Sequence, residues 1–401
     1  MITAMPRRAT MWFVACTLVL SGAGCTFVPQ RDPLPAALAS LAKPLGEPNL
    51  RSWGDEISPQ TKKWLAAGVE TDAQKYPALV GRPHNYLAIS GGGANGAFGA
   101  GLLVGWSARG DRPDFTVVTG ISTGALVAPF VFLGPDYDEL LQELYTTIST
   151  GDILKKRNFF IRFFSDSLMD SKPLEALLER YIDEPFMEAI AAESEKGRGL
   201  YIGTTHLDAG RPVIWNIGNI ARSGHPGALD LIRRVLLASA SIPAIFPPVL
   251  IDVEAGDKSY DELHVDGGVA AQVFFYQAGI KWSRVLEKFG VPGVPRTYII
   301  RNSHLGPRWM QVRNKALPIA GRSLATLIQR QATDDLHRIY LLARRDGIDF
   351  NLAYIPDDFN TSQKEIFDPQ YMRDLFNLGY RMGRDGYPWR KLPLELEGII
   401  D

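Results

Sequence analysis

The chain has 401 residues, of which 46% are hydrophobic and 22% charged, and its formal net charge is -1. This length allows one large domain or two ordinary ones with a sizeable core, and the balanced charge excludes a broadly basic nucleic-acid-binding protein. The two cysteines, Cys16 and Cys25, both lie in the first 25 residues. The rest of the chain therefore holds no disulfide framework, cysteine zinc site or cysteine nucleophile.

The N-terminal 25 residues have the pattern of an export signal. Arg7 and Arg8 precede an apolar run, Met11–Leu20, that is too short for a comfortable membrane span. Small residues then lead into Cys25 and resemble the lipobox of bacterial lipoproteins. We expect Cys25 to be lipidated and to anchor the exported protein to a membrane of the cell envelope. The alternative is ordinary secretion, to the periplasm or beyond, after cleavage near Ala23.

Residues 26–82 are rich in proline and show no strong periodicity, which predicts a tether and an N-terminal extension. From residue 83 the pattern alternates. The sequence predicts a strand at Asn85–Ser90, a helix at Ala97–Ala108, a strand at Phe115–Thr119 and a helix at Ala125–Leu133. This alternation is typical of a parallel sheet with crossover helices, hence of the α/β class.

The remaining elements continue this pattern to residue 387. Strands are predicted at Leu200–Thr205, Val213–Ile217, Leu263–Val265 and Thr297–Arg301. Helices are predicted at Asp138–Ile148, Pro173–Tyr181, Leu229–Ser239, Leu324–Ala343 and Pro369–Met382. We therefore expect one α/β domain over residues 83–387, followed by a C-terminal tail at 388–401.

A candidate nucleophile lies between the second predicted strand and the second helix. Gly120-x-Ser122-x-Gly124 has the spacing and the context of a nucleophile elbow, in which flanking glycines permit a sharp turn. The helix that follows supplies backbone donors and a partial positive charge. The alternative is a glycine-rich turn with Ser122 as a helix N-cap.

A second glycine-rich turn, Gly91–Gly96, follows the first predicted strand. Consecutive glycines allow backbone N–H groups to converge on an anion, either a phosphate or the oxyanion of an acyl-transfer intermediate. The turn lacks the Lys-Ser/Thr ending of a P-loop, and no acidic residue ends the next strand, so nucleotide binding is disfavoured. Together with the candidate elbow it predicts an oxyanion hole.

A carboxylate ends a third predicted strand. In Val265-Asp266-Gly267-Gly268, Asp266 could accept the Ser122 proton, while the two glycines leave the approach open. An ordinary Asp-Gly turn is the alternative.

In this order the three motifs resemble the patatin-like phospholipase family over Asn85–Val269, and the run Ala238–Pro248 resembles the family's Ser- and Pro-containing block. The resemblance implies a three-layer α/β/α fold with a central, mainly parallel sheet. It implies Ser122 as nucleophile, Asp266 as proton acceptor and the amides of Gly91, Gly92 and Gly93 as oxyanion hole. The implied activity is hydrolysis of glycerolipid or phospholipid esters through an acyl-enzyme, without metal or cofactor.

The glycine loop departs from the family pattern, which usually reads DGGGxRG. Ser90 stands in place of the Asp and Asn95 in place of the Arg. The backbone donors survive both changes, whereas a fixed positive charge is lost from the loop.

Three alternatives remain open. His304 or His337 could complete a Ser-Asp-His triad, and His264 shares a strand face with Asp266. The Arg- and Phe-rich run Arg157–Phe164 could be a lip that dips into lipid or, as we favour, a buried connector. The protein could also be a lipid-binding lipoprotein without catalysis.

Overall fold

The computed structural model describes residues 31–67, 75–156, 167 and 169–397. Three predicted segments lie outside the described residues: the export signal with its candidate lipidation site Cys25, residues 26–30 of the tether, and the run Arg157–Phe164. No helix within the described part is long and apolar enough to cross a membrane.

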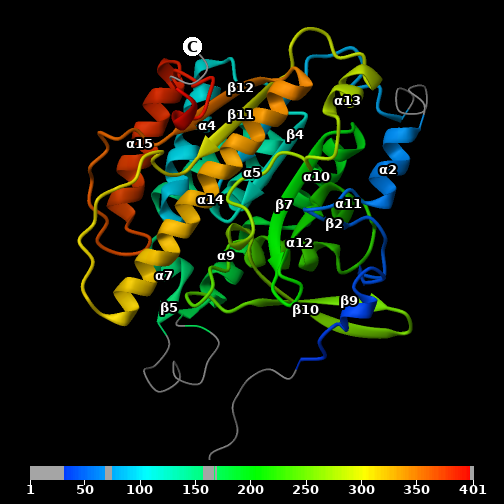
Figure 1. Ribbon diagram of the computed structural model, residues 1–401, viewed down its shortest axis with the longest axis horizontal. Coiled ribbons are helices and arrows are strands. Elements are labelled where there is room, and N and C mark those ends of the chain that lie inside the picture. The colour runs from blue at the N-terminus through cyan, green and yellow to red at the C-terminus, as the bar shows by residue number, and fades with distance from the viewer. Residues whose placement is uncertain (1–30, 68–74, 157–166, 168, 398–401) are drawn as a thin grey trace, which may run out of the picture.

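A ten-stranded mixed sheet forms the centre of the molecule (Figure 1). Five strands form its parallel part, in the spatial order β12-β11-β3-β4-β7. They are β3 (Asn85–Ile89), β4 (Val117–Ile121), β7 (Gly199–His206), β11 (Arg296–Arg301) and β12 (Asp349–Tyr354). Parallel order follows from the crossover helices that the sequence places between these strands.

Antiparallel strands extend the sheet beyond β7. They are β8 (Arg211–Asn216), β9 (Val249–Ala255), β10 (Lys258–Asp266) and the short β1 (Lys43–Pro44) and β2 (Arg51–Trp53). The N-terminal segment thus supplies two strands of the main sheet. A separate two-stranded ribbon joins β5 (Lys155–Lys156) to β6 (Met169–Asp170).

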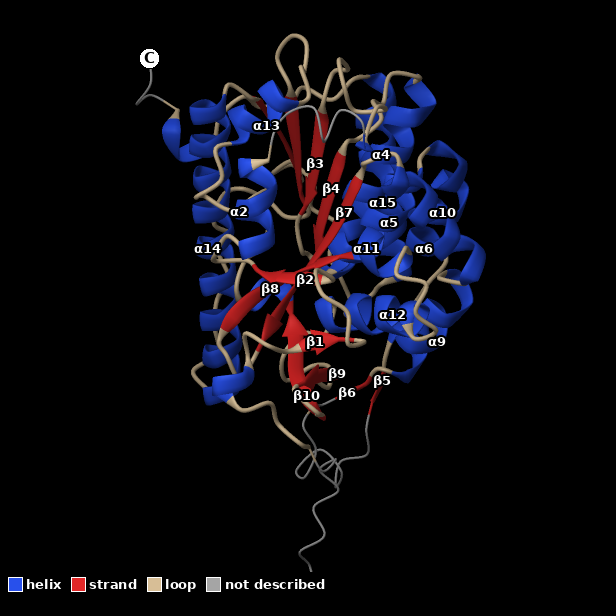
Figure 2. Cartoon of the chain, turned by 90° about the vertical axis from the view of Figure 1, so that its right-hand side faces the viewer, coloured by secondary structure: helices blue, strands red, loops and turns tan. Residues whose placement is uncertain are grey.

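Helices cover both faces of the sheet, which Figure 2 shows nearly edge-on. On one side lie α4 (Gly96–Arg109), α5 (Thr123–Leu133), α6 (Asp138–Thr146), α7 (Thr150–Ile153), α9 (Lys172–Tyr181), α10 (Glu184–Glu195), α11 (Ile217–Ala221), α12 (Ala228–Ser239) and α15 (Pro369–Asp385). On the other lie α2 (Pro59–Ala66), α13 (Trp282–Lys288) and α14 (Ala316–Asp346). Short 3₁₀ turns are η1 (Ala36–Leu38), η2 (Gly93–Asn95), η3 (Pro135–Tyr137), η4 (Gly267–Val269) and η5 (Leu394–Leu396). The predicted three-layer α/β/α arrangement with a mainly parallel centre is confirmed.

The sheet separates two apolar cores because side chains alternate across each strand. On β3, Leu87 and Ile89 enter the larger core with α4 and α5, whereas Tyr86 and Ala88 enter the smaller core under α14. All four side chains are buried. A continuous apolar run is what a strand covered on both faces requires, and it fixes β3, with the glycine loop after it, in the middle of the domain.

The structure differs from the sequence prediction at several boundaries. Strand β4 begins two residues later than predicted and ends at Ile121. Helix α14 begins at Ala316, eight residues before the predicted start. Strands β9 and β12 and helix α10 were not predicted. In β9 the outward-facing residues Asp252 and Glu254 are acidic and exposed. The strand therefore has a polar sequence pattern, although Val249, Ile251 and Val253 are buried.

Candidate active site

The ends of β4 and β10 meet beside β7. Strand β8 pairs along one side of β7, so β4 and β10 must share the other side. The last residue of β4, Ile121, pairs with Gly203, and the last residue of β10, Asp266, pairs with Thr204. The two strands run toward each other and stop one register position apart. This topology brings Ser122 and Asp266 together, although 144 residues separate them in sequence.

Ser122 forms a strained turn between β4 and α5. Its φ of 55° and ψ of -126° are a conformation that a residue with a side chain rarely adopts. A Cβ on Gly124 would lie 2.3 Å from the Ile89 carbonyl oxygen, and one on Gly120 would lie 2.4 Å from the Gly124 carbonyl oxygen. Only glycine fits at either position, and the sharp strand-turn-helix geometry is that of a nucleophile elbow.

The run Ala238–Pro248 fastens both ends of the site. The Ser239 hydroxyl accepts the Ser122 N–H at 3.0 Å and donates to the Gly203 carbonyl at 2.7 Å. The Ser241 carbonyl accepts the N–H of Asp266 at 2.9 Å. Both serines are buried. These bonds hold the strained elbow and the carboxylate-bearing residue on one rigid support.

The Asp266 carboxylate is 5% exposed and lies next to Ser122. It accepts the Gly268 N–H at 2.7 Å, and the Ser122 hydroxyl is its second hydrogen-bond donor. Burial raises the pKa of Asp266 to about 6, although both hydrogen bonds oppose this shift. At neutral pH the side chain is therefore mostly ionised yet more basic than an exposed aspartate, which suits a proton acceptor.

The glycine loop lies over Ser122. A Cβ on Gly91 would come within 3.2 Å of the Ser122 Cβ. The Gly91 N–H donates to the Gln272 carbonyl at 3.1 Å, so it is already occupied. Within the described residues, the N–H groups of Gly92 and Gly93 have no acceptor, and Gly92 is exposed. The open donors of this loop are therefore those of Gly92 and Gly93.

Two long-range contacts that sequence reasoning missed set the position of this loop. The first is Asn302, fully buried just after β11. Its N–H donates to the Ser90 hydroxyl at 2.9 Å and its side-chain amide to the Ser90 carbonyl at 3.0 Å, while its side-chain oxygen accepts the Gly99 N–H at 3.1 Å. A Cβ on Gly92 would lie 2.5 Å from the Asn302 carbonyl oxygen. Asn302 thus ties the loop to α4.

The second contact runs from α14 through Gln272. The Asp335 carboxylate accepts the Gln272 N–H at 2.7 Å, and the Gln272 side chain donates to the Gly268 carbonyl at 2.7 Å. Because the Gln272 carbonyl also holds Gly91, one residue links the glycine loop to the turn after Asp266. No local motif marks Gln272 or Asp335, because their role depends on contacts between distant segments.

None of the chain's six histidines, all of which the structure describes, hydrogen-bonds to Ser122 or Asp266. Both ring nitrogens of His264 are engaged, by Thr204 and Glu262, and burial lowers its pKa to about 4. His304 lies 3.7 Å from the Asp357 carboxylate, and His337 lies 3.4 Å from Glu395. The arrangement offers Ser122 a carboxylate and no imidazole.

Two residues next to the candidate dyad are exposed: Gly92 in the glycine loop and Val269, three residues after Asp266, which is 46% exposed. A cavity of about 880 Å³ is lined by residues of α2 and α13 and by Ile121 and Gly267, the chain neighbours of the two candidate residues. Ser122 and Asp266 do not line this cavity. In the described part of the chain, no group of three or more His, Cys, Asp or Glu side chains could hold a metal ion.

Comparison with known families agrees with this geometry. Residues 87–278 match the family model of patatin-like phospholipases. The chain contains a patatin-like phospholipase domain. The match encloses the glycine loop, the elbow and Asp266.

No curated protein matches the chain in sequence. The crystal structure of VipD from Legionella pneumophila is similar, with a TM-score of 0.38 and 13% sequence identity. The similarity covers 76% of this chain and 66% of VipD, so the chain spans slightly less than two thirds of VipD's length.

Proposed function

We propose that the patatin-like domain cleaves acyl esters of glycerolipids through a Ser-Asp dyad. The observation that carries the proposal is the strained Ser122 elbow placed against a buried carboxylate, Asp266, whose pKa is raised to about 6. An aspartate in water is a weak base toward an alcohol. Here the proton moves only as the new C–O bond forms, and the raised pKa favours that transfer.

In the proposed mechanism, Ser122 Oγ attacks the ester carbonyl and Asp266 takes its proton. The N–H groups of Gly92 and Gly93 would stabilise the oxyanion, each by about 3–4 kcal/mol as in other serine hydrolases. The alcohol leaves with the proton from Asp266, and the acyl group stays on Ser122. Water, deprotonated by Asp266, then attacks this acyl-enzyme and releases the fatty acid.

The experiment that tests this function compares three proteins on a soluble short-chain glycerol ester. Wild-type protein is expected to turn the ester over, and Ser122→Ala to lose that turnover while keeping its thermal transition. Ser107→Ala, a serine on α4 whose side chain contacts the Leu103 carbonyl and Asp138, away from the candidate site, serves as control and should match the wild type. Wild-type protein inert on every ester would favour the lipid-binding alternative.

We also propose that the enzyme acts at a bacterial envelope membrane through acylated Cys25. The support is the lipobox-like run before Cys25 in the sequence. Radiolabelled palmitate should enter the wild-type protein and not Cys25→Ser. Equal labelling of both proteins, or of neither, would contradict the anchor.

A further inference from the structure

The first half of α14 and the segment before it carry an unusual concentration of exposed apolar side chains. Of the fourteen large apolar side chains that are exposed in the described part of the chain, six lie within residues 309–327. We call these six the α14 patch: Trp309, Met310, Val312, Ile319, Leu324 and Leu327. Trp309 is 99% exposed. A concentration of exposed apolar side chains of this kind marks a place where another surface binds.

The helix in this region has little of the chain to pack against. Between Ala316 and Leu327 no described side chain is buried, and the first buried residue of α14 is Ala332. Most of the stability of a helix in a protein comes from tertiary packing of one of its faces. An apolar partner would supply the packing that the chain itself does not provide.

The charge around the patch is one-sided. Residues 305–333 contain no Asp or Glu, while Arg308, Arg313, Lys315, Arg322 and Arg330 are all cationic. Within the described residues none of these five pairs with a carboxylate. Arg308 donates to the main-chain carbonyl of Asp357, whose carboxylate lies beside His304. Apolar residues interspersed with unpaired cations fit an anionic lipid surface.

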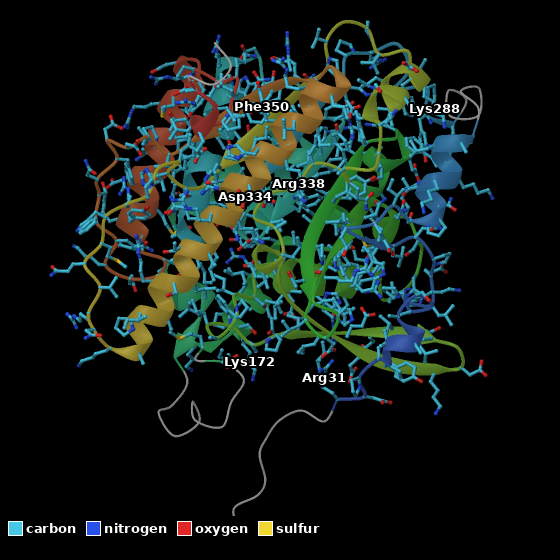
Figure 3. All side chains as sticks on the ribbon, viewed as in Figure 1. Arg31, Lys172, Lys288, Asp334, Arg338 and Phe350 are labelled. Atoms are coloured by element: carbon cyan, nitrogen blue, oxygen red, sulfur yellow. The ribbon has the colours of Figure 1, made fainter. Side chains whose placement is uncertain are left out.

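Three of the six patch residues lie on α14, the helix that also contacts the candidate active site. Gln331 donates to the carbonyl of Val269, three residues after Asp266, and Asp335 accepts the N–H of Gln272, whose carbonyl holds Gly91. At a rise of about 1.5 Å per residue, Leu327 lies roughly 12 Å along the helix from Asp335, and Ile319 roughly 24 Å. Figure 3 labels Asp334 and Arg338 where α14 crosses the sheet, and Figure 1 shows the helix continuing from there to a free N-terminal end.

We propose that the α14 patch docks the domain onto an anionic lipid surface, with exposed Val269, which is bonded to α14, facing that surface. The choice of lipid, rather than a protein partner, rests on the proposed function as well as on the charge. The patch contains none of the residues Arg157–Phe164, the lip considered from sequence, which lie outside the described residues.

The test uses full-length protein carrying Ser122→Ala, so that lipid is bound and not consumed. Vesicles of equal parts phosphatidylglycerol and phosphatidylcholine, with brominated acyl chains, quench any tryptophan that enters them. The signal of Trp309 is obtained by subtracting the signal of a Trp309→Phe protein, which separates it from any anchoring by the N-terminus. We expect Trp309 to be quenched, and quenching to fall in high salt and with pure phosphatidylcholine.

A pair of variants tests the apolar part of the patch. Leu324→Ser combined with Leu327→Ser should weaken vesicle binding by about tenfold or more, because two leucines lose their apolar burial. Leu341→Ser, on the same helix, 63% exposed and outside the patch, should bind as its parent does. With Ser122 restored, both proteins should hydrolyse a soluble ester at the wild-type rate.

Absence of Trp309 quenching, or equal binding by the two leucine variants, would overturn the docking proposal. So would a concentration-dependent dimer that the Leu324/Leu327 variant abolishes without any change in vesicle binding, since a second copy would then be the occupant. Failure of the proposed function has a different signature. The wild-type protein would be inert on soluble esters, while Trp309 quenching by vesicles persisted.

Discussion

The end of the sheet at Ser122 and the first half of α14 are built in opposite ways. Around Ser122, a Cβ on Gly120 or Gly124 would clash with backbone, and buried hydrogen bonds hold Ser122 and Asp266 in place. Along Ala316–Leu327 no described side chain is buried, and Arg322 has no carboxylate partner among the described residues. A preorganised site tolerates no movement, whereas a surface that meets a partner cannot be packed against its own chain. The proposed chemistry and the proposed docking are therefore carried by different parts of the chain.

Substituting one glycine in each region should give the largest difference in stability between the two regions. Gly124→Ala places a methyl group against the carbonyl oxygens of Ile89 and Ser90 and should cost about 3 kcal/mol of unfolding free energy, or prevent folding. Gly321→Ala in α14 meets nothing within 4 Å and should stabilise by up to about 1 kcal/mol, the helix propensity difference. Urea unfolding measures both. Equal effects would remove the contrast between the two regions.

Asp266→Asn tests how much the buried, ionised carboxylate lowers the free energy of unfolding. Because the pKa of Asp266 is raised in the folded state, its ionised form destabilises the fold. The penalty is absent below the ordinary pKa of 3.8, grows as pH rises to about 6 and is constant above it. At pH 8 the free energy of unfolding of Asp266→Asn, measured with urea, should therefore exceed that of the wild type by about 3 kcal/mol. This difference should vanish at low pH. A gain independent of pH would contradict the assignment.

Asn302→Ala should act on the glycine loop without touching substrate. Two buried partners, the Ser90 carbonyl and the Gly99 N–H, lose a bond, which should cost about 2 kcal/mol of stability. Because the N–H groups of Gly92 and Gly93 would then be less fixed, kcat on a soluble ester should fall about tenfold with KM nearly constant. Asn351→Ala, a buried asparagine on β12 distant from the loop, is the matched control. Equal kinetic losses in both variants would show a merely structural effect.

The smallest effect is expected in the α14 patch. Leu324→Ser and Leu327→Ser should each change the unfolding free energy by no more than about 0.5 kcal/mol, since neither side chain is buried in the free protein. Thermal unfolding without vesicles measures this. A loss as large as that of a core leucine would mean that the patch already packs against the chain.

Sequence alone led to the centre of the site because that geometry is local. The elbow needs glycines two residues on either side of Ser122, and Asp266 stands at a strand end before two glycines. Asn302, Gln272 and Asp335 could not be found in this way, since their partners lie up to 212 residues away and no spacing records the contact.

Local sequence pattern likewise predicted the elements of the fold better than their long-range pairing. The continuously apolar strand β3 was predicted within a residue, whereas β9 was missed because its exposed face is acidic. Helix α14 was predicted too short because Pro318 and Gly321 interrupt the helical pattern near its start. That the N-terminal segment would join the main sheet through β1 and β2 depends on long-range pairing that composition does not reveal.

The most direct test of a Ser-Asp dyad is the rate at which a fluorophosphonate labels Ser122, read by peptide mass spectrometry at pH 8. Wild type and a His304→Ala, His337→Ala double variant should be labelled at the same rate. Asp266→Asn should be labelled slower by about a hundredfold or more, as expected for loss of a general base. Loss of labelling in the histidine variant, or unchanged labelling in Asp266→Asn, would contradict the central claim.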